Sequence, residues 1–134
     1  MKLAASLVIL IGAAALAAMS FLSPTAESMP EENHVRHVVV FKYSPDATAE
    51  QINTVTEAFT ALKDKIPGIV GFEHGINNSP EGKNLGFTHV YLMTFESNEA
   101  RDAYLPHPEH NAFGELLMGS GIFEDAFVVD YVIQ

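Results

Sequence analysis

Four histidines and one tyrosine are the side chains of this sequence best suited to acid–base chemistry. Tyr104, His107 and His110 lie close together in the chain, and His37 and His89 lie in two separate apolar runs. Histidine titrates near neutral pH and is a common proton acceptor, and a phenol can donate to a carbonyl oxygen on which charge develops. Brought to one cavity, these groups predict a site for proton transfer. The alternative interpretation is structural: each histidine is a core residue bonded to a backbone carbonyl, and Tyr104 anchors a loop.

Two pairs of histidines also have spacings at which both could bind one metal ion. They are His107-x-x-His110, which a proline distorts, and His34-x-x-His37, whose members would point to opposite faces of a strand. The chain has no cysteine, and no carboxylate beyond Glu109 falls at a convincing spacing. We therefore expect no metal and no cofactor.

Residues 1–28 have the layout of a secretory signal peptide. Lys2 precedes an uncharged run rich in Ala, Leu and Ile, and small residues then offer a cleavage site after Ser28. The run at residues 3–22 is also about long enough to cross a bilayer, so an uncleaved membrane anchor is the alternative. In either case we expect the rest of the chain to be exported, to the periplasm or the extracellular space, with membrane contact only if the leader is retained.

After the leader we expect a short linker at 29–33 and one small domain at 34–134. The chain of 134 residues has 17 acidic and 7 basic side chains, a net charge of −10. The leader contains one of each kind, so the domain keeps this charge, which disfavours nucleic acid as a partner. The absence of cysteine excludes disulfides and thiol catalysis. A domain of this size has a modest core and gains stability from a partner subunit.

Hydrophobic periodicity and turn residues predict the order β-α-β-β-α-β. Thr48 with Gln51 forms a capping box at the start of the first helix, and Pro67-Gly68 ends it. Asp130 is interpreted as part of a strand end rather than as a chemical group. We expect strands at 37–43, 69–76, 87–95 and 126–132, and helices at 48–66, 98–104 and from 108 to Gly119 or Gly121, the last with Phe113, Leu116 and Leu117 on one side.

This order predicts a ferredoxin-like α+β sandwich, with a four-stranded antiparallel sheet covered by helices on one face. We expect the first and third strands to be neighbours that run parallel, which would place His37 and His89 at the same end of the sheet. The last helix would return along the sheet and bring His110 to the level of His89. Both faces of the central strands are apolar, so the uncovered face predicts a two-fold dimer, sheet against sheet.

Six segments of the sequence form a recognisable set: His37-Val-Val-Val-Phe41-Lys42, Ile66-Pro67-Gly68-Ile69, Ser79-Pro80-Glu81-Gly82, Gly86-Phe87-Thr88-His89, Thr94-Phe95-Glu96-Ser97 and Tyr104-Leu-Pro-His107-Pro108-Glu-His110. In order and spacing they resemble the stress-responsive α/β-barrel domain family, the Dabb family. The resemblance implies a ferredoxin-like protomer and a dimer whose sheets form a barrel. One plant member is a cofactor-free polyketide cyclase; the resemblance implies that its catalytic pair falls on Tyr104 and His110, and two further pocket histidines on His37 and His89. The export leader is a departure from that cytosolic enzyme.

The leading hypothesis is an exported homodimer that binds a small, partly apolar molecule between helices and sheet. His110 would act as general base and Tyr104 as hydrogen-bond donor. The side chains expected to line the ligand are His37, His89, Phe59 and His107. The second hypothesis is a non-enzymatic stress-response or interaction protein whose dimer is the functional unit. A third is a cofactor-free monooxygenase of the wider dimeric barrel superfamily.

Overall fold

The computed structural model describes residues 33–134, so the predicted leader and all but the last residue of the predicted linker lie outside the described residues. Within that part of the chain, no helix is long and apolar enough to cross a membrane. The order of elements is the predicted one, with each helical half divided into two helices. The elements are β1 (Val35–Tyr43), α1 (Ala49–Thr60), α2 (Leu62–Lys65), β2 (Ile69–Ile76), β3 (His89–Phe95), α3 (Asn98–Tyr104), α4 (Pro108–Gly119) and β4 (Phe123–Val132).

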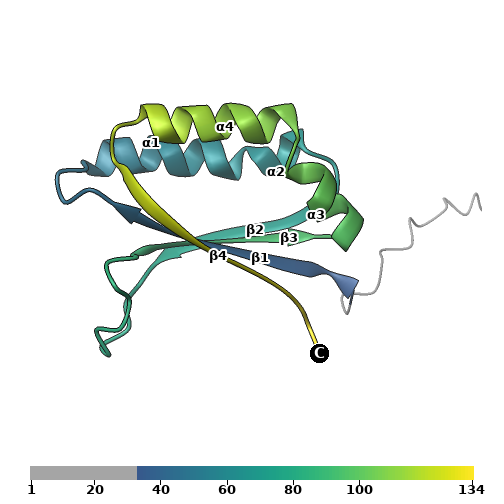
Figure 1. Ribbon diagram of the computed structural model, residues 1–134, viewed down its shortest axis with the longest axis horizontal. Helices are drawn as coiled ribbons and strands as arrows, with labels where there is room; N and C mark the ends of the chain where they lie inside the picture. The colour runs from purple at the N-terminus through teal and green to yellow at the C-terminus, as the bar shows by residue number, and fades with distance from the viewer. Residues whose placement is uncertain (1–32) are drawn as a thin grey trace, which may run out of the picture.

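The four strands form one sheet in the order β2-β3-β1-β4, and every neighbouring pair is antiparallel. The helices lie together on one face of this sheet and leave the other face open (Figure 1). The predicted ferredoxin-like fold is therefore confirmed.

The predicted parallel direction of β1 and β3 is wrong. The loop between β2 and β3 reverses the chain, so β3 runs opposite to both of its neighbours, β1 and β2. In the resulting register His37 pairs with Met93, and His89 pairs with Phe41. Four residues of strand, about 13 Å, separate His37 from the position opposite His89. The two histidines consequently lie toward different ends of the sheet.

The capping box at the start of α1 is present as predicted. The Thr48 hydroxyl accepts from the Gln51 backbone N–H at 3.2 Å, and the Gln51 side-chain oxygen accepts from the Thr48 N–H at 2.9 Å. Both bonds satisfy N–H groups that a helix start would otherwise leave without a helical partner.

Thr48→Ala should lower the free energy of unfolding by about 1 kcal/mol, because it removes the hydroxyl that caps α1. Urea denaturation of the two proteins measures this difference. Thr54→Ala is the matched control: the Thr54 hydroxyl bonds only back to the Glu50 carbonyl on the exposed side of the same helix, and alanine has the higher helix propensity. An equal loss of unfolding free energy in both variants would show that the Thr48 cap makes no specific contribution to stability.

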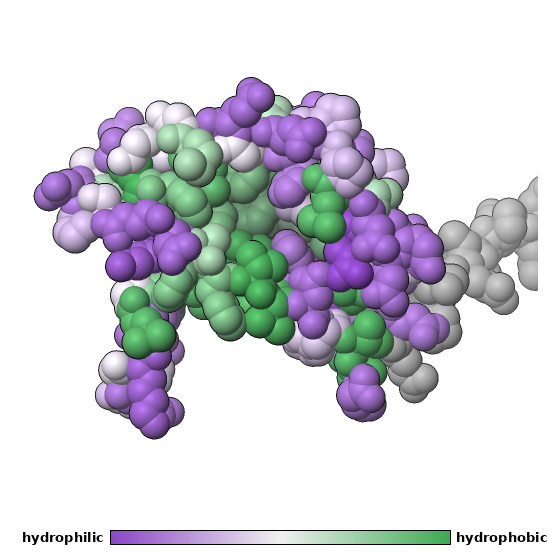
Figure 2. Space-filling view, viewed as in Figure 1, coloured by the Kyte–Doolittle hydropathy of each residue, from purple (hydrophilic) through white to green (hydrophobic). Residues whose placement is uncertain are grey.

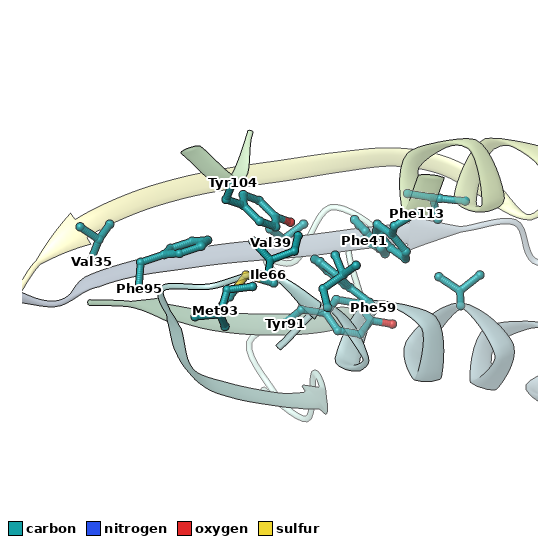
Figure 3. Packing of buried hydrophobic residues seen from close by; sticks show 14 of the residues in the cluster. Val35, Val39, Phe41, Phe59, Ile66, Tyr91, Met93, Phe95, Tyr104 and Phe113 are labelled. Atoms are coloured by element: carbon teal, nitrogen blue, oxygen red, sulfur yellow. The ribbon is translucent and has the colours of Figure 1, made fainter. Parts of the chain in front are cut away.

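Side chains alternate strictly along β1. Val35, His37, Val39, Phe41 and Tyr43 face the helices and are buried. The space between them and the helices is filled largely by aromatic rings, as Figure 3 shows. This layer is the hydrophobic core of the domain.

In α4, the first helical residue is the predicted Pro108, and Phe113 and Leu117 are buried. Leu116, which we expected beside them, is exposed. It lies about 100° round the helix from Leu117, at the edge of a groove between α1 and α4.

The face of the sheet away from the helices is apolar and open. Val38 of β1 pairs with Leu92 of β3 on one side and with Val129 of β4 on the other, so these three side chains form a row across the sheet. The loop at 77–88 and the end of β4 project beyond this face on either side of it (Figure 1). Apolar surface is also visible along the β4 side of the molecule in Figure 2. A face of this kind is typical of a protein–protein interface.

Candidate functional site

Three of the predicted site residues, from three different elements, lie together at one end of the molecule. They are His37 of β1, Tyr104 at the end of α3 and His110 in the second turn of α4. The Tyr104 ring centroid is 4.2 Å from that of His110 and 5.8 Å from that of His37. We call these three side chains the Tyr104 cluster. Tyr104 is its centre because it contacts both histidines.

The Tyr104 hydroxyl is buried and has no hydrogen-bond partner among the described residues. The side chain is only 1% exposed, and Figure 3 shows its hydroxyl oxygen pointing into the interior over β1. Burial raises the pKa of this phenol above its ordinary value, so it remains a neutral O–H donor at physiological pH. An unpaired buried hydroxyl costs about 1–3 kcal/mol. A bound ligand with an acceptor atom would satisfy this donor.

The second member of the Tyr104 cluster, His110, has its protonation pattern set by the turn before α4. Its Nδ1–H donates to the Leu105 carbonyl oxygen at 2.9 Å. Because a carbonyl oxygen only accepts, the proton of the neutral ring lies on Nδ1 and the lone pair lies on Nε2. His110 is half-buried, so this residue connects the buried tyrosine with the surface. Its Nε2 is therefore available as a base.

The third member, His37, is oriented by a residue that the sequence analysis assigned to a strand end. Asp130 lies directly opposite His37 in the register of β1 and β4, and its carboxylate accepts from His37 Nδ1 at 2.6 Å. Arg101 of α3 donates to the other oxygen of the same carboxylate. Asp130 and Arg101 are thus polar groups of the site that sequence reasoning missed. The available signal was a single acidic residue among the apolar side chains of the strand predicted at 126–132.

His89 does not join the Tyr104 cluster. It lies beside Tyr43, with ring centroids 5.0 Å apart, and its Nδ1 is 2.9 Å from the Thr88 hydroxyl oxygen. Burial, and secondarily the charge of nearby His74, lowers the pKa of His89. The expectation that His37, His89 and His110 share one end of the sheet is corrected by the antiparallel direction of β3.

The two remaining predicted lining residues have structural contacts. His107 caps α4, because its Nδ1 accepts from the Glu109 backbone N–H at 3.2 Å. Phe59 is stacked between Phe41 and Phe113, with centroid distances of 5.7 and 4.4 Å. A role for either side chain in ligand binding stays a prediction.

Four grooves of the described surface lie away from the Tyr104 cluster. Grooves of about 300 and 540 Å³ lie against the open face of the sheet, and grooves of about 390 and 420 Å³ lie beside α1. None of these four is lined by His37, Tyr104 or His110. His37 and Tyr104 are buried and His110 is half-buried, so His110 is the member of the cluster that reaches the surface.

Residues 35–133 match the Dabb family, described as the stress responsive A/B barrel domain. The chain belongs to this family. Two relatives show how the Dabb domain is used elsewhere. The stress-response A/B barrel domain-containing protein HS1 of Arabidopsis thaliana is 31% identical over 97 residues, which cover 72% of this chain and 87% of that protein. Olivetolic acid cyclase of Cannabis sativa is 29% identical over 97 residues, which cover 72% of this chain and 94% of the cyclase.

Solved structures of other proteins share the Dabb fold. The hydroxynitrile lyase of Passiflora edulis superposes with a TM-score of 0.69 at 25% identity, covering 77% of this chain and 95% of the lyase. A dimeric ferredoxin-like protein of unknown function from Jannaschia sp. CCS1 superposes with a TM-score of 0.64 at 27% identity, covering 75% of this chain and all of that protein. The predicted family and fold are both confirmed. Among these relatives are enzymes, a stress-response protein and a dimer.

Proposed function

We propose that this Dabb protein is a homodimer that binds a small, partly apolar carbonyl compound at the Tyr104 cluster and catalyses proton transfer without a cofactor. The observation that carries the proposal is the buried Tyr104 hydroxyl, which lacks a partner and lies against the ring of His110. A donor without an acceptor, next to a histidine with a free Nε2, is the arrangement that enolisation requires. Relatives that are a cyclase and a lyase support catalysis by this fold on small molecules.

The proposed reaction begins with a carbonyl oxygen placed at the Tyr104 hydroxyl. His110 Nε2 removes a proton from the carbon next to that carbonyl; the C–H electron pair moves toward the oxygen, and Tyr104 stabilises the enolate by hydrogen bonding. The enolate carbon then attacks a second carbonyl of the same molecule. The imidazolium of His110 returns its proton to the new alkoxide. Every proton and electron pair is accounted for within the substrate and His110, so no further reactant is needed.

The homodimer proposal rests on the open sheet face and on the dimeric ferredoxin-like neighbour. The row of Val38, Leu92 and Val129 is apolar, and burying it against a second copy would remove it from water. Export remains a proposal from the leader sequence, with residues 1–28 removed after translocation or kept as an anchor.

The second candidate function is a non-enzymatic stress-response protein whose dimer is the functional unit. The filled core favours it: Phe41, Phe59 and Phe113 occupy the space between helices and sheet that the enzyme hypothesis assigned to a ligand. The relative HS1, a stress-response protein, supports the same alternative.

Proton exchange in 1,3-diketones tests the enzymatic proposal. Acetylacetone and homologues with longer alkyl chains exchange the hydrogens between their carbonyls for deuterium, and NMR in D₂O follows the rate. The wild-type protein should accelerate this exchange above the buffer rate. His110→Asn should reduce the acceleration by about 100-fold or more, because asparagine keeps an N–H donor for the Leu105 carbonyl and lacks the base at Nε2.

The matched control is His74→Asn, the same substitution at an exposed histidine of β2 outside the cluster. It should leave the exchange rate unchanged, and neither variant should shift the thermal midpoint by more than a few degrees. Absence of any acceleration by the wild-type protein, across the diketone series, would contradict the enzymatic proposal and favour the stress-response alternative.

A further inference from the structure

A charged side chain on α3 is linked through two hydrogen bonds to the buried histidine of the site. Arg101 donates from one terminal nitrogen to Asp130 and from Nε to Asp102 at 2.7 Å. Asp130 in turn accepts from His37 Nδ1. The side chains of Arg101 and Asp130 are 21% and 26% exposed, whereas that of Asp102 is 66% exposed. The chain of contacts therefore runs from the surface inward, from Arg101 through Asp130 to His37.

The position of Arg101 on α3 gives a second link between this series of contacts and the Tyr104 cluster. Arg101 and Tyr104 are three residues apart on α3 and so lie on neighbouring positions of one helix face. One of them bonds to Asp130 and the other contacts the His37 ring. One turn of α3 therefore acts on His37 in two ways. Tyr104 contacts the His37 ring, and Arg101 holds the Asp130 carboxylate that bonds to it.

We propose that Arg101 is a positioning residue of the site: through Asp130 it holds His37 as the Nδ1–H tautomer with its ring against Tyr104. This inference rests on the proposed function, because the His37 ring contacts Tyr104, the proposed hydrogen-bond donor. A carboxylate that is bonded to an arginine stays ionised and only accepts hydrogen bonds. Its partner nitrogen on His37 therefore has to carry the proton, which leaves the lone pair on Nε2.

The Coulomb energy of the ion pair alone is a weak explanation for this arrangement. Pairs that are partly open to water contribute about 0–1 kcal/mol to stability, and Asp102 already gives Arg101 a partner on its own helix. The bond between Arg101 and its second partner, Asp130, instead fixes the orientation of the Asp130 carboxylate. Without Arg101, one oxygen of Asp130 loses its donor, and the carboxylate, on the edge strand β4, is free to turn away from His37.

The decisive experiment is ¹⁵N NMR of the histidine rings in wild-type protein and in Arg101→Gln. In the wild type, His37 should show a protonated Nδ1 and an unprotonated Nε2 when the ring is neutral. Arg101→Gln should convert this single pattern into a mixture of tautomers. It should also slow any diketone exchange by about 10-fold to 100-fold, the loss that follows removal of a partner that orients a metal-bound histidine. Arg101→Lys should restore part of both readouts, because an ammonium still pairs with one carboxylate oxygen.

Asp102→Asn is the matched control, since it changes the other partner of Arg101 and leaves the bond to Asp130 in place. It should preserve the His37 tautomer. Asp130→Asn gives a second test that retains the Arg101 side chain and should also produce mixed tautomers. An unchanged His37 pattern in Arg101→Gln and in Asp130→Asn would overturn the inference even in an active enzyme. A changed pattern in a protein that exchanges no diketone would uphold the inference and remove only the proposed function.

Discussion

Val129→Asp should convert the proposed dimer into monomers, raising its dissociation constant by about 100-fold or more. Val129 lies on the open face of the sheet, beside Val38, and is 41% exposed in the single chain. In the monomer an aspartate at this position would remain hydrated and would change the free energy of unfolding little. In a sheet-against-sheet dimer the same carboxylate would be removed from water in both copies, at a cost of several kcal/mol for each ion, and about 2.7 kcal/mol already corresponds to 100-fold.

The neighbouring residue supplies the control for this prediction. Val128 is 51% exposed and points to the opposite, helix-covered side of the same strand, since it pairs with buried Val39. Val128→Asp introduces the same charge with the same strand propensity and should leave the dissociation constant within a few-fold of the wild-type value. Sedimentation velocity over a range of protein concentrations measures both constants. Equal behaviour of the two variants would show that the open face is not the dimer interface.

Local sequence patterns predicted the elements of this fold well, because the decisive signals lie within a few residues of each other. The capping box needs only Thr48 and Gln51, and the alternation along β1 needs only one strand. Such local patterns do not predict the direction of β3 relative to β1. It follows from how a hairpin places β3 between β1 and β2, and the mistaken direction moved His89 to the wrong end of the sheet.

The polar partners of His37 illustrate a second limit. Asp130 is 93 residues away from His37 in the chain, and in the sequence it is one acidic residue near the end of an apolar strand. Its function depends on the register that places it opposite His37. Arg101 is still less visible, because its spacing from Tyr104 indicates a shared helix face only after the boundaries of α3 are known. Tyr104 and His110 were easier to single out, since both belong to one short segment.

Phe59 shows why a ligand wall and a core position look alike in a sequence. Both require an apolar side chain at helical spacing, and the structure places this ring in a continuous stack with Phe41 and Phe113. The distinction between a site and a core therefore depends on polar groups that the core leaves unsatisfied. In the described part of this chain the Tyr104 hydroxyl is such a group.

Tyr104→Phe should make the protein more stable and less active at the same time. The substitution keeps the ring that contacts Phe95 and His110 and removes a buried hydroxyl that has no partner. We expect the free energy of unfolding to rise by about 1 kcal/mol, the lower end of the cost of an unsatisfied buried group. Loss of the donor to the developing oxyanion should reduce diketone exchange by about 100-fold to 1,000-fold.

Tyr43→Phe separates this effect from that of removing any buried phenol. The Tyr43 hydroxyl is 3.1 Å from the Tyr91 hydroxyl, so its removal breaks a hydrogen bond and should lower the free energy of unfolding by about 1 kcal/mol. It should leave exchange unchanged. Urea denaturation and the exchange assay are applied to both variants. The free energy of unfolding should rise in Tyr104→Phe and fall in Tyr43→Phe, and only Tyr104→Phe should lose exchange activity. If Tyr104→Phe instead loses stability as Tyr43→Phe does, the Tyr104 hydroxyl has a structural partner, and the strongest reason for placing a ligand at this cluster is gone.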